Sequence, residues 1–264
     1  MKFWTEPYLL FYRFREILSQ TVYRDIRGRY AGSTLGLAWL VLYPVLLLGV
    51  YAIVYVVILR VRLPQFSSTE YIFLIFCGLI PFLGFSEGLG SGVPSVVANA
   101  SLIRNTMFPI DLIPVKAVLV AQSTQVVGMV LLVAASAALG KLTPWVLLIV
   151  PIWICQILLT CGLMWILSTL NVFFRDLQTF IPIVILALML ISPIQYTVDM
   201  VPSQLRPLMA MNPLFHIIIS YQSVLLEGVF PTQTFPVLLV VSVIVFSLGH
   251  RLFTRLKTTF SDHV

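Results

Sequence analysis

The feature that most constrains this chain is an uncharged stretch of 30 residues, from Tyr30 to Leu59, that follows seven charged residues between Arg13 and Arg29. About 20 apolar residues, each rising about 1.5 Å along a helix, cross the roughly 30 Å hydrocarbon core of a bilayer. The uncharged stretch is therefore typical of a membrane span. The charged run before it indicates the membrane–water interface.

The composition extends this interpretation to the whole chain. Of its 264 residues, 59% are hydrophobic and only 10% are charged, whereas a soluble domain carries roughly a quarter charged residues. We therefore expect an all-α membrane protein. The net charge of +6 does not indicate nucleic-acid binding, because the basic residues flank apolar runs instead of lining a patch between aromatic residues.

Apolar runs predict six spans in a single transmembrane domain that covers residues 1–264. A cytoplasmic interfacial helix (1–33) precedes them, and a cytoplasmic tail (251–264) follows them. We find no internal repeat and no low-complexity linker that would divide this domain. The predicted spans are 34–59, 71–98, 117–139, 144–174, 179–196 and 235–250.

The basic residues indicate which way the chain is inserted. If the N-terminus is inside, 12 of the 16 Lys and Arg residues fall on the inner side, and the outer side holds only Arg60, Arg62, Lys141 and Arg206. Basic residues collect on the cytoplasmic side of membrane proteins. We therefore expect both termini to be cytoplasmic.

The N-terminal segment is amphipathic. Its charged residues, Arg15 and Arg24 among them, occupy other faces than the apolar residues, so we expect a helix that lies in the inner interface. It is interpreted either as a plain topology anchor or as a docking surface for a cytoplasmic partner. The apolar face is predicted to comprise Leu10, Phe14, Ile17, Leu18, Val22 and Ile26.

The first predicted span carries two pairs of aromatic residues, Trp39 with Tyr43 and Tyr51 with Tyr55, each four residues apart. An interfacial aromatic belt suits Trp39 and Tyr55 but not the two central tyrosines. Tyrosine hydroxyls in mid-membrane need hydrogen-bond partners. A hydrated path or a sugar-bearing substrate would supply these partners, and helix–helix packing is the competing interpretation.

Glu87 is the one acidic residue inside a predicted span. It would lie about 24 Å along a straight helix from Tyr71, near the inner interface. There it is either hydrated or lines a polar path, since carboxylates within the membrane are costly and are usually functional.

Catalytic signatures are missing from the sequence. There is no paired carboxylate, nucleophile elbow or P-loop, and no metal site is expected, because His216 and His250 have no acidic or cysteine neighbours at ligand spacing. Any transport against a gradient would therefore draw its energy from another chain or from an ion. The cysteines lie in apolar runs and are predicted to be buried free thiols: Cys77, Cys155 and Cys161.

Residues 199–231 are too long for a simple loop and too interrupted for a span. Asn212 and Pro213 are typical of a helix start, and Gly228 of a helix end. The predicted helix of some 15 residues, about 22 Å long, suits a re-entrant or interfacial position on the outer side. A second short helix is expected at about Ser203 to Ala210.

Several segments together resemble one family. RGRYAGSTLGLAWLVLYP (Arg27 to Pro44) is similar to the N-terminal motif of ABC-transporter permeases that export bacterial O-antigen, capsule and teichoic acid. Asn105 departs from a frequent basic residue of the family, and Phe82 stands where a tryptophan is common. Further matches are GLIPF (Gly78 to Phe82), the segment Leu102 to Pro114, LNVFFRDL (Leu170 to Leu177), SPIQY (Ser192 to Tyr196) and Asn212-Pro213.

The resemblance implies a homodimer in the bacterial inner membrane, paired with two copies of a cytoplasmic ABC ATPase. The ATPase would hold ATP and Mg, so this chain would be a transport subunit and not an enzyme, with no cofactor of its own. The cargo would be a long glycan on a lipid carrier, and periplasmic or outer-membrane export components are further expected partners.

Three groups of site residues follow from the residues and from the resemblance together. The substrate path would include Trp39, Tyr43, Tyr51, Tyr55, Phe82 and Glu87. Coupling to the ATPase would involve Arg15, Arg24, Leu102, Arg104, Phe108 and Asp111. A periplasmic gate would be formed by the short outer helices, with Arg206, Asn212, Pro213, His216 and Tyr221.

Two alternative functions stay open at this point. One is an exporter of the same superfamily that carries a drug or a lipid. The other is an ATP-independent carrier, channel or integral membrane enzyme. A neighbouring ATPase gene would separate the ABC exporters from the ATP-independent class, and neighbouring glycan-biosynthesis genes would favour the polysaccharide exporter.

Overall fold

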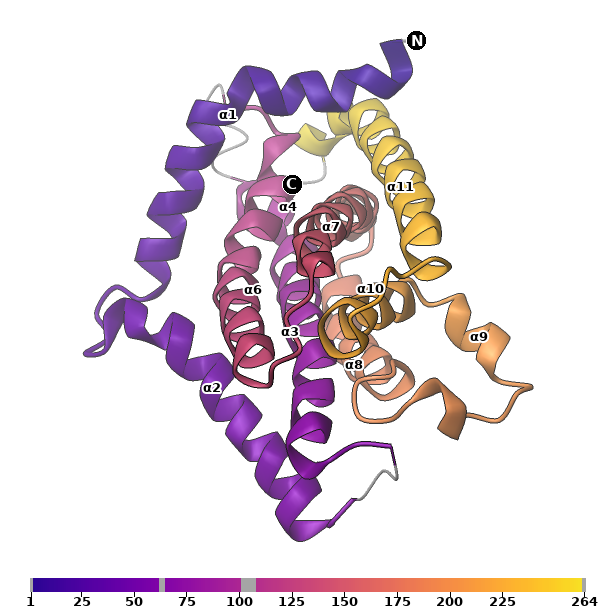
Figure 1. The fold of residues 1–264 in the computed structure, drawn as a ribbon. Helices are drawn as coiled ribbons and strands as arrows, with labels where there is room; N and C mark the ends of the chain where they lie inside the picture. The colour runs from indigo at the N-terminus through magenta and orange to yellow at the C-terminus, as the bar shows by residue number, and fades with distance from the viewer. Residues whose placement is uncertain (1, 62–64, 101–107, 263–264) are drawn as a thin grey trace.

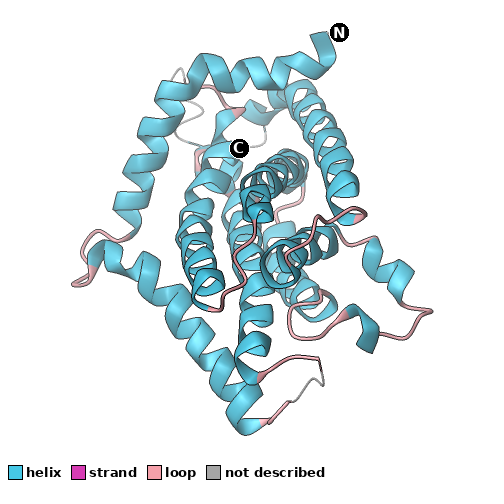
Figure 2. Ribbon diagram, in the orientation of Figure 1, coloured by secondary structure: helices cyan, strands magenta, loops and turns pink. Residues whose placement is uncertain are grey.

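The computed structural model describes residues 2–61, 65–100 and 108–262. Within these residues all regular elements are helical, and Figure 2 shows no strand among them. Most of the long helices form one bundle, and both termini lie at the same end of it (Figure 1). The α-helices are α1 (Lys2–Arg29), α2 (Trp39–Ala52), α3 (Ser68–Gly92), α4 (Ser95–Ala98), α6 (Leu112–Ala138), α7 (Ile149–Phe173), α8 (Leu177–Ile191), α9 (Arg206–Ala210), α10 (Pro213–Gln222) and α11 (Thr234–Leu256).

Short turns of other helix types extend several of these helices. A π-helical turn, Ile53–Ile58, continues α2, and another, Ser223–Glu227, continues α10. The remaining short elements are 3-10 turns: Gly36–Ala38, Pro144–Leu148, Val198–Met200 and Lys257–Asp262.

Five helical segments of the described residues are long and apolar enough to cross a membrane. They correspond to five of the six predicted spans. The predicted span 179–196 is instead the 15-residue helix α8, about 22 Å long, because the chain leaves the helix at Ser192 and Pro193. The five segments are Gly36–Ile58, Ser68–Gly92, Leu112–Ala138, Pro144–Phe173 and Thr234–Phe260.

Helix α3 is the central helix of the bundle, and most of its length is buried between its neighbours. Its close approach to α6 depends on two glycines: a Cβ on Gly84 would overlap the side chain of Gln125, and one on Gly128 would overlap Ile80. The predicted second span, 71–98, is wrong at its end. Helix α3 ends at Gly92, and residues 95–98 form the separate turn α4, with the ring of Pro94 between them.

Helices α7 and α11 cross with their backbones in close contact. A Cβ on Gly162 would lie 2.5 Å from the carbonyl oxygen of Val245, and a Cβ on Gly249 would overlap the backbone of Gly162. Only residues without side chains permit this crossing. Helix α11 also runs beyond the predicted end at residue 250, because Phe253 and Phe260 are buried against the bundle.

Helix α1 is kinked at Phe14, whose backbone angles are φ −108° and ψ 16°. Figure 1 shows its first part crossing the end of the bundle and its second part running down beside α6. Of the residues predicted for the apolar face, Leu18 is buried against the bundle whereas Ile17 is exposed.

Candidate functional site

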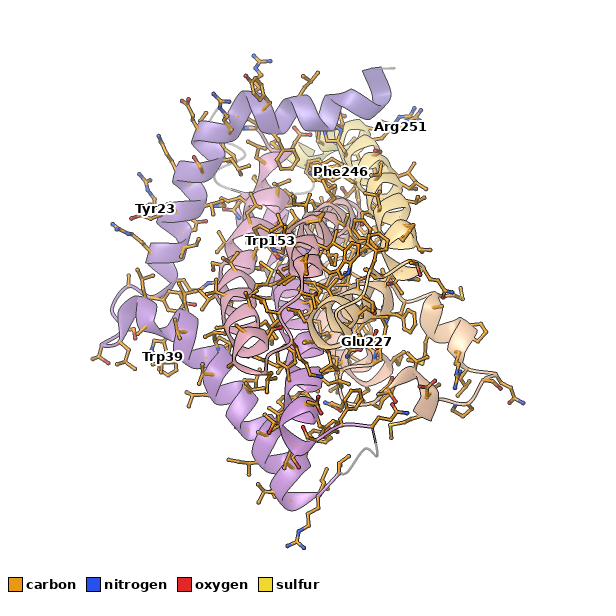
Figure 3. The ribbon with its side chains drawn as sticks, viewed as in Figure 1. Tyr23, Trp39, Trp153, Glu227, Phe246 and Arg251 are labelled. Atoms are coloured by element: carbon orange, nitrogen blue, oxygen red, sulfur yellow. The ribbon has the colours of Figure 1, made fainter. Side chains whose placement is uncertain are left out.

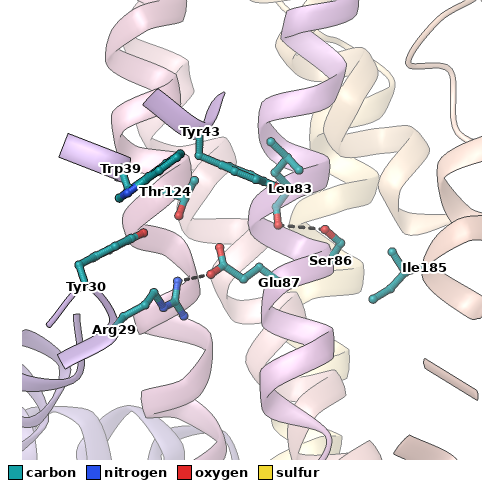
Figure 4. A pocket seen from close by; sticks show the side chains of 9 residues that line it. All are labelled: Arg29, Tyr30, Trp39, Tyr43, Leu83, Ser86, Glu87, Thr124 and Ile185. Carbon is teal, nitrogen blue, oxygen red and sulfur yellow. Dashed lines mark hydrogen bonds and ion pairs between the residues drawn. The ribbon is translucent and has the colours of Figure 1, made fainter. Parts of the chain in front are cut away.

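A pocket of about 440 Å³ opens beside the start of the first span. It lies where the end of α1 and the start of α2 meet α3, α6 and α8 (Figure 4). Its wall is mixed, with three aromatic rings, the hydroxyls of a serine and a threonine, and two opposite charges. The lining residues are Arg29, Tyr30, Trp39, Tyr43, Leu83, Ser86, Glu87, Thr124 and Ile185.

An ion pair crosses the pocket. The guanidinium of Arg29, the last residue of α1, donates to the carboxylate of Glu87 on α3, and Thr124 of α6 lines the same pocket. Figure 4 shows this contact at the opening between the helices. Both side chains stay about one-third exposed, so the pair is partly desolvated and still reachable from the pocket.

A second ion pair lies one helical turn earlier on α1. Asp25 pairs with Lys116 of α6 at 2.8 Å. Residues four apart lie on the same face of a helix, so Asp25 and Arg29 fasten that face of α1 to two different spans with opposite charges.

The structure brings some of the predicted path residues together and separates others. Trp39, Tyr43 and Glu87 all line the pocket. The Tyr43 side chain is half exposed, and the indole N–H of Trp39 donates to the hydroxyl of Ser33 at 3.1 Å. Phe82, by contrast, is buried in the core cluster.

Tyr51 and Tyr55 lie away from the pocket and pack on each other. Their rings are stacked with centroids 6.0 Å apart and an interplanar angle of 7°. The hydroxyl of Tyr51 points to the sulfur of Met189 at 3.6 Å, and that of Tyr55 donates to Gln195 Oε1 at 2.7 Å. These contacts are helix–helix packing, one of the two interpretations that the sequence left open.

The segment after α8 is held in place by side chains from four other parts of the chain. Ser192 and Ile194 are buried although the backbone there is not helical. Unpaired backbone groups are costly away from water, and here Tyr71 and Gln222 bond two backbone carbonyls of the segment, while Tyr55 and Asn212 bond two of its side chains. We call these contacts the Gln195 cage: Tyr55 to Gln195 Oε1, Tyr71 to the Gln195 carbonyl (2.9 Å), Gln222 to the Pro193 carbonyl (3.1 Å) and Asn212 to the Ser192 hydroxyl (2.9 Å).

The residues predicted for a gate occupy two different environments. Asn212 caps α10 by accepting from the Leu214 N–H at 3.0 Å, with Pro213 in the first turn as the sequence predicts. Arg206 donates to nearby backbone carbonyls, and His216 Nε2 contacts the Ala210 carbonyl at 2.8 Å. Tyr221 instead lies inside the bundle, fully buried.

A network of glutamines links the spans, and the sequence analysis missed it. Gln125 of α6 and Gln156 of α7 exchange two amide hydrogen bonds of 2.8 Å each. Gln156 also donates to the Pro81 carbonyl at 2.8 Å, and Trp153 donates to Gln122 at 2.9 Å. Uncharged polar residues within the apolar runs were the available signal, since such groups join membrane helices.

Of the residues predicted for coupling, Asp111 contacts the C-terminal part of the chain. Asp111 is buried and accepts from Lys257 at 2.7 Å, and its carbonyl accepts from the Trp165 indole at 2.9 Å. Arg15 and Arg24 are exposed on α1 and Phe108 is half-buried. Leu102 and Arg104 lie outside the described residues.

The cysteine prediction is confirmed, because Cys77, Cys155 and Cys161 are free and buried. Among the described residues, no group of three or more His, Cys, Asp or Glu side chains is placed to hold a metal ion.

Five helices long and apolar enough to cross a membrane, among the described residues, are typical of a multi-pass membrane protein, and a pocket of mixed character opens beside the first of them. The sequence model of one family, described as "ABC-2 type transporter", matches residues 18–226. This chain belongs to that family.

Curated relatives match over most of their length. An "O-antigen export system permease protein RfbA" of Klebsiella pneumoniae is 31% identical over 242 residues, which cover 90% of this chain and 91% of the relative. A protein of the same name from Myxococcus xanthus is 28% identical and covers 96% of this chain and 97% of the relative. The "Polysialic acid transport protein KpsM" of Escherichia coli is 29% identical over 74% of this chain and 75% of its own length.

Proposed function

We propose that this chain is the permease subunit of an ATP-driven exporter that carries a lipid-linked cell-surface polysaccharide across the cytoplasmic membrane. The observation that carries the proposal is its similarity, over about nine-tenths of both chains, to proteins named as O-antigen export permeases. The apolar composition and the pocket beside the first span support it. Both termini would face the cytoplasm, where basic residues collect.

The pocket suits a sugar-bearing cargo. Aromatic rings pack against the C–H faces of sugar rings and a phenol also offers a polar tip, while charged groups make strong hydrogen bonds to hydroxyls. Tyr43 and Trp39 would supply the rings, and Arg29 with Glu87 the hydrogen bonds. Phe82 would support this wall from the core behind it. Tyr51 and Tyr55 would fix the position of the first span.

A separate ATPase would drive the transport. Arg15 and Arg24 leave a basic surface on α1, and Asp111 ties the start of α6 to the C-terminal helix through Lys257. Force on either part would reach the pocket, because Asp25 and Arg29 join α1 to α6 and α3. Leu102, Arg104 and Phe108 would complete the contact with the partner.

The short helices at the other end of the bundle would form the periplasmic gate. Helices α9 and α10 are tied to the end of α8 through Asn212 and Gln222 of the Gln195 cage. In this proposal α8 is the sixth span, with residues 192–196 completing its length, and α10 is re-entrant. Opening would require the cage to rearrange.

Co-purification tests the proposal directly. An ABC ATPase should co-purify with the tagged chain in a complex of two copies of each. This complex should hydrolyse ATP faster when its lipid-linked glycan is added. Asp111→Asn, which removes the charge that pairs with Lys257 and keeps the size of the side chain, should retain the ATPase but lose glycan stimulation. A chain that moves its cargo with no ATPase bound would overturn the proposal.

A further inference from the structure

A groove between α7 and α11 lies apart from the pocket described above. It has a volume of about 320 Å³ and belongs to the end of the bundle that carries both termini. Figure 1 places α11 and α2 on opposite sides of the bundle, so this groove and the pocket open toward different surroundings. Its walls are Ile166 of α7 and Leu248, Arg251, Leu252 and Arg255 of α11.

The groove has an apolar row and a basic row. Leu248 and Leu252, four residues apart on α11, are exposed, although both are large apolar side chains in a span, so lipid covers them in a bilayer. Arg251 and Arg255, also four residues apart, form the second row beside them, and Figure 3 shows Arg251 at the outer side of the helix end. Arginines at helix ends extend their charge toward the headgroups.

The two arginines are spaced to share one anion. Residues four apart on a helix have Cβ atoms about 5–6 Å apart. At this spacing one phosphate can accept hydrogen bonds from both guanidiniums. Among the described residues, no carboxylate forms an ion pair with Arg255.

We propose that this groove binds one anionic phospholipid, with its phosphate between Arg251 and Arg255 and an acyl chain along Leu248, Leu252 and Ile166. Basic pockets between spans on the cytoplasmic side bind acidic lipid headgroups. An acidic face of a protein partner would match the arginines but not the apolar floor, which continues into the membrane-spanning part of both helices. A bilayer lipid matches both parts.

The test measures lipid retention by the purified full-length chain. The chain is incorporated into bilayer nanodiscs of phosphatidylcholine with a minority of phosphatidylglycerol, then extracted with mild detergent, and the lipids that stay bound are counted by native mass spectrometry. The wild-type chain should retain phosphatidylglycerol over phosphatidylcholine. R251Q/R255Q should reduce that preference about tenfold, and R251K/R255K, which keeps the charge but loses the planar fork, should reduce it less.

Matched variants separate this site from general charge attraction. R13Q/R27Q removes two exposed arginines of α1 and should leave the preference unchanged. Leu248→Trp fills the groove without changing charge and should lower retention, and its folding is checked by its melting temperature. Inorganic phosphate at millimolar concentration should not displace the lipid, because the acyl contacts add to the phosphate contact.

Several results would overturn the proposal. One is equal retention of phosphatidylglycerol by the wild type and R251Q/R255Q, and another is a loss of the preference in R13Q/R27Q as large as that in R251Q/R255Q. Full retention of the lipid by a folded Leu248→Trp would also overturn it. Displacement of the lipid by inorganic phosphate would indicate a plain anion site. Because no step measures glycan export, the outcome does not depend on the proposed transport function.

Discussion

Arg29 and Glu87 show how a single contact joins an amphipathic helix to a span. Each would be costly alone among apolar helices, and together they form a hydrogen-bonded pair that is still partly hydrated. Sequence reasoning found Glu87 because it is the one acidic residue in a predicted span. It did not find the partner, because the two residues are 58 positions apart and only the turn between α1 and α2 brings them together.

Removing one partner of this pair should destabilise the chain. We expect Arg29→Ala and Glu87→Arg each to cost about 1–3 kcal/mol, because each leaves a partly desolvated charge without its partner. The double variant Arg29→Glu/Glu87→Arg should recover part of the loss. The loss of stability is measured as a change in melting temperature in detergent, monitored by tryptophan fluorescence. Arg27→Ala, at an exposed position, is the control. Single variants that melt like the wild type would contradict the role of the pair.

Tyr43 and Tyr51 should respond differently to the same substitution. Tyr43 is half exposed at the pocket, whereas Tyr51 is stacked on Tyr55. We expect Tyr43→Leu to lower glycan export several-fold with little change in melting temperature. Tyr51→Leu should lower the melting temperature more, since it loses an aromatic pair worth about 0.5–1.5 kcal/mol. Surface glycan and melting are measured on both variants, and normal export by Tyr43→Leu would remove it from the path.

At the scale of elements, the sequence predicted most helices because charge and apolar length mark where a chain enters and leaves a membrane. It also predicted the cap at Asn212, because capping is a local property. It did not predict where α8 ends. The segment after Ile191 is stabilised by Tyr55, Tyr71 and Gln222, which are distant in sequence, so no local pattern reports it.

The Gln195 cage gives an element-scale prediction. Tyr55→Phe removes a hydroxyl that bonds Gln195, and Gln222→Met removes the donor to the Pro193 carbonyl. Each should cost about 1 kcal/mol and speed amide hydrogen exchange in residues 192–200. Tyr23→Phe makes the same chemical change on an exposed ring (Figure 3) and should have no effect. Unchanged exchange in both cage variants would show that the segment is held by apolar packing alone.

The crossing of α7 and α11 gives a second prediction at the scale of elements. Gly162→Ala and Gly249→Ala should each destabilise the chain by about 1–3 kcal/mol or more, because the added methyl group meets backbone atoms that have no room to move. Gly90→Ala is the matched control. It lies in α3 with open space around its Cβ position, so alanine should be neutral or stabilise by about 0.5–1 kcal/mol. Equal melting temperatures for all three would contradict the close crossing.

At the scale of the whole molecule, α2 differs from the other spans. Only 6% of its most apolar window is buried within the chain, against 78% for α3. Many of its apolar side chains therefore face lipid or a second subunit. A second copy packed along α2 would cover the pocket on that side, because Trp39 and Tyr43 of α2 line it. The proposed homodimer would thus complete a path that one chain leaves open on one side.

The central claim is that this chain carries the glycan across the cytoplasmic membrane, and surface glycan in a deletion strain tests it most directly. Deleting the gene should abolish surface polysaccharide while lipid-linked glycan accumulates inside, and the wild-type gene should restore export. A Tyr43→Leu gene, expressed to the same level, should restore it only partly. Undiminished surface polysaccharide in the deletion strain would contradict the account.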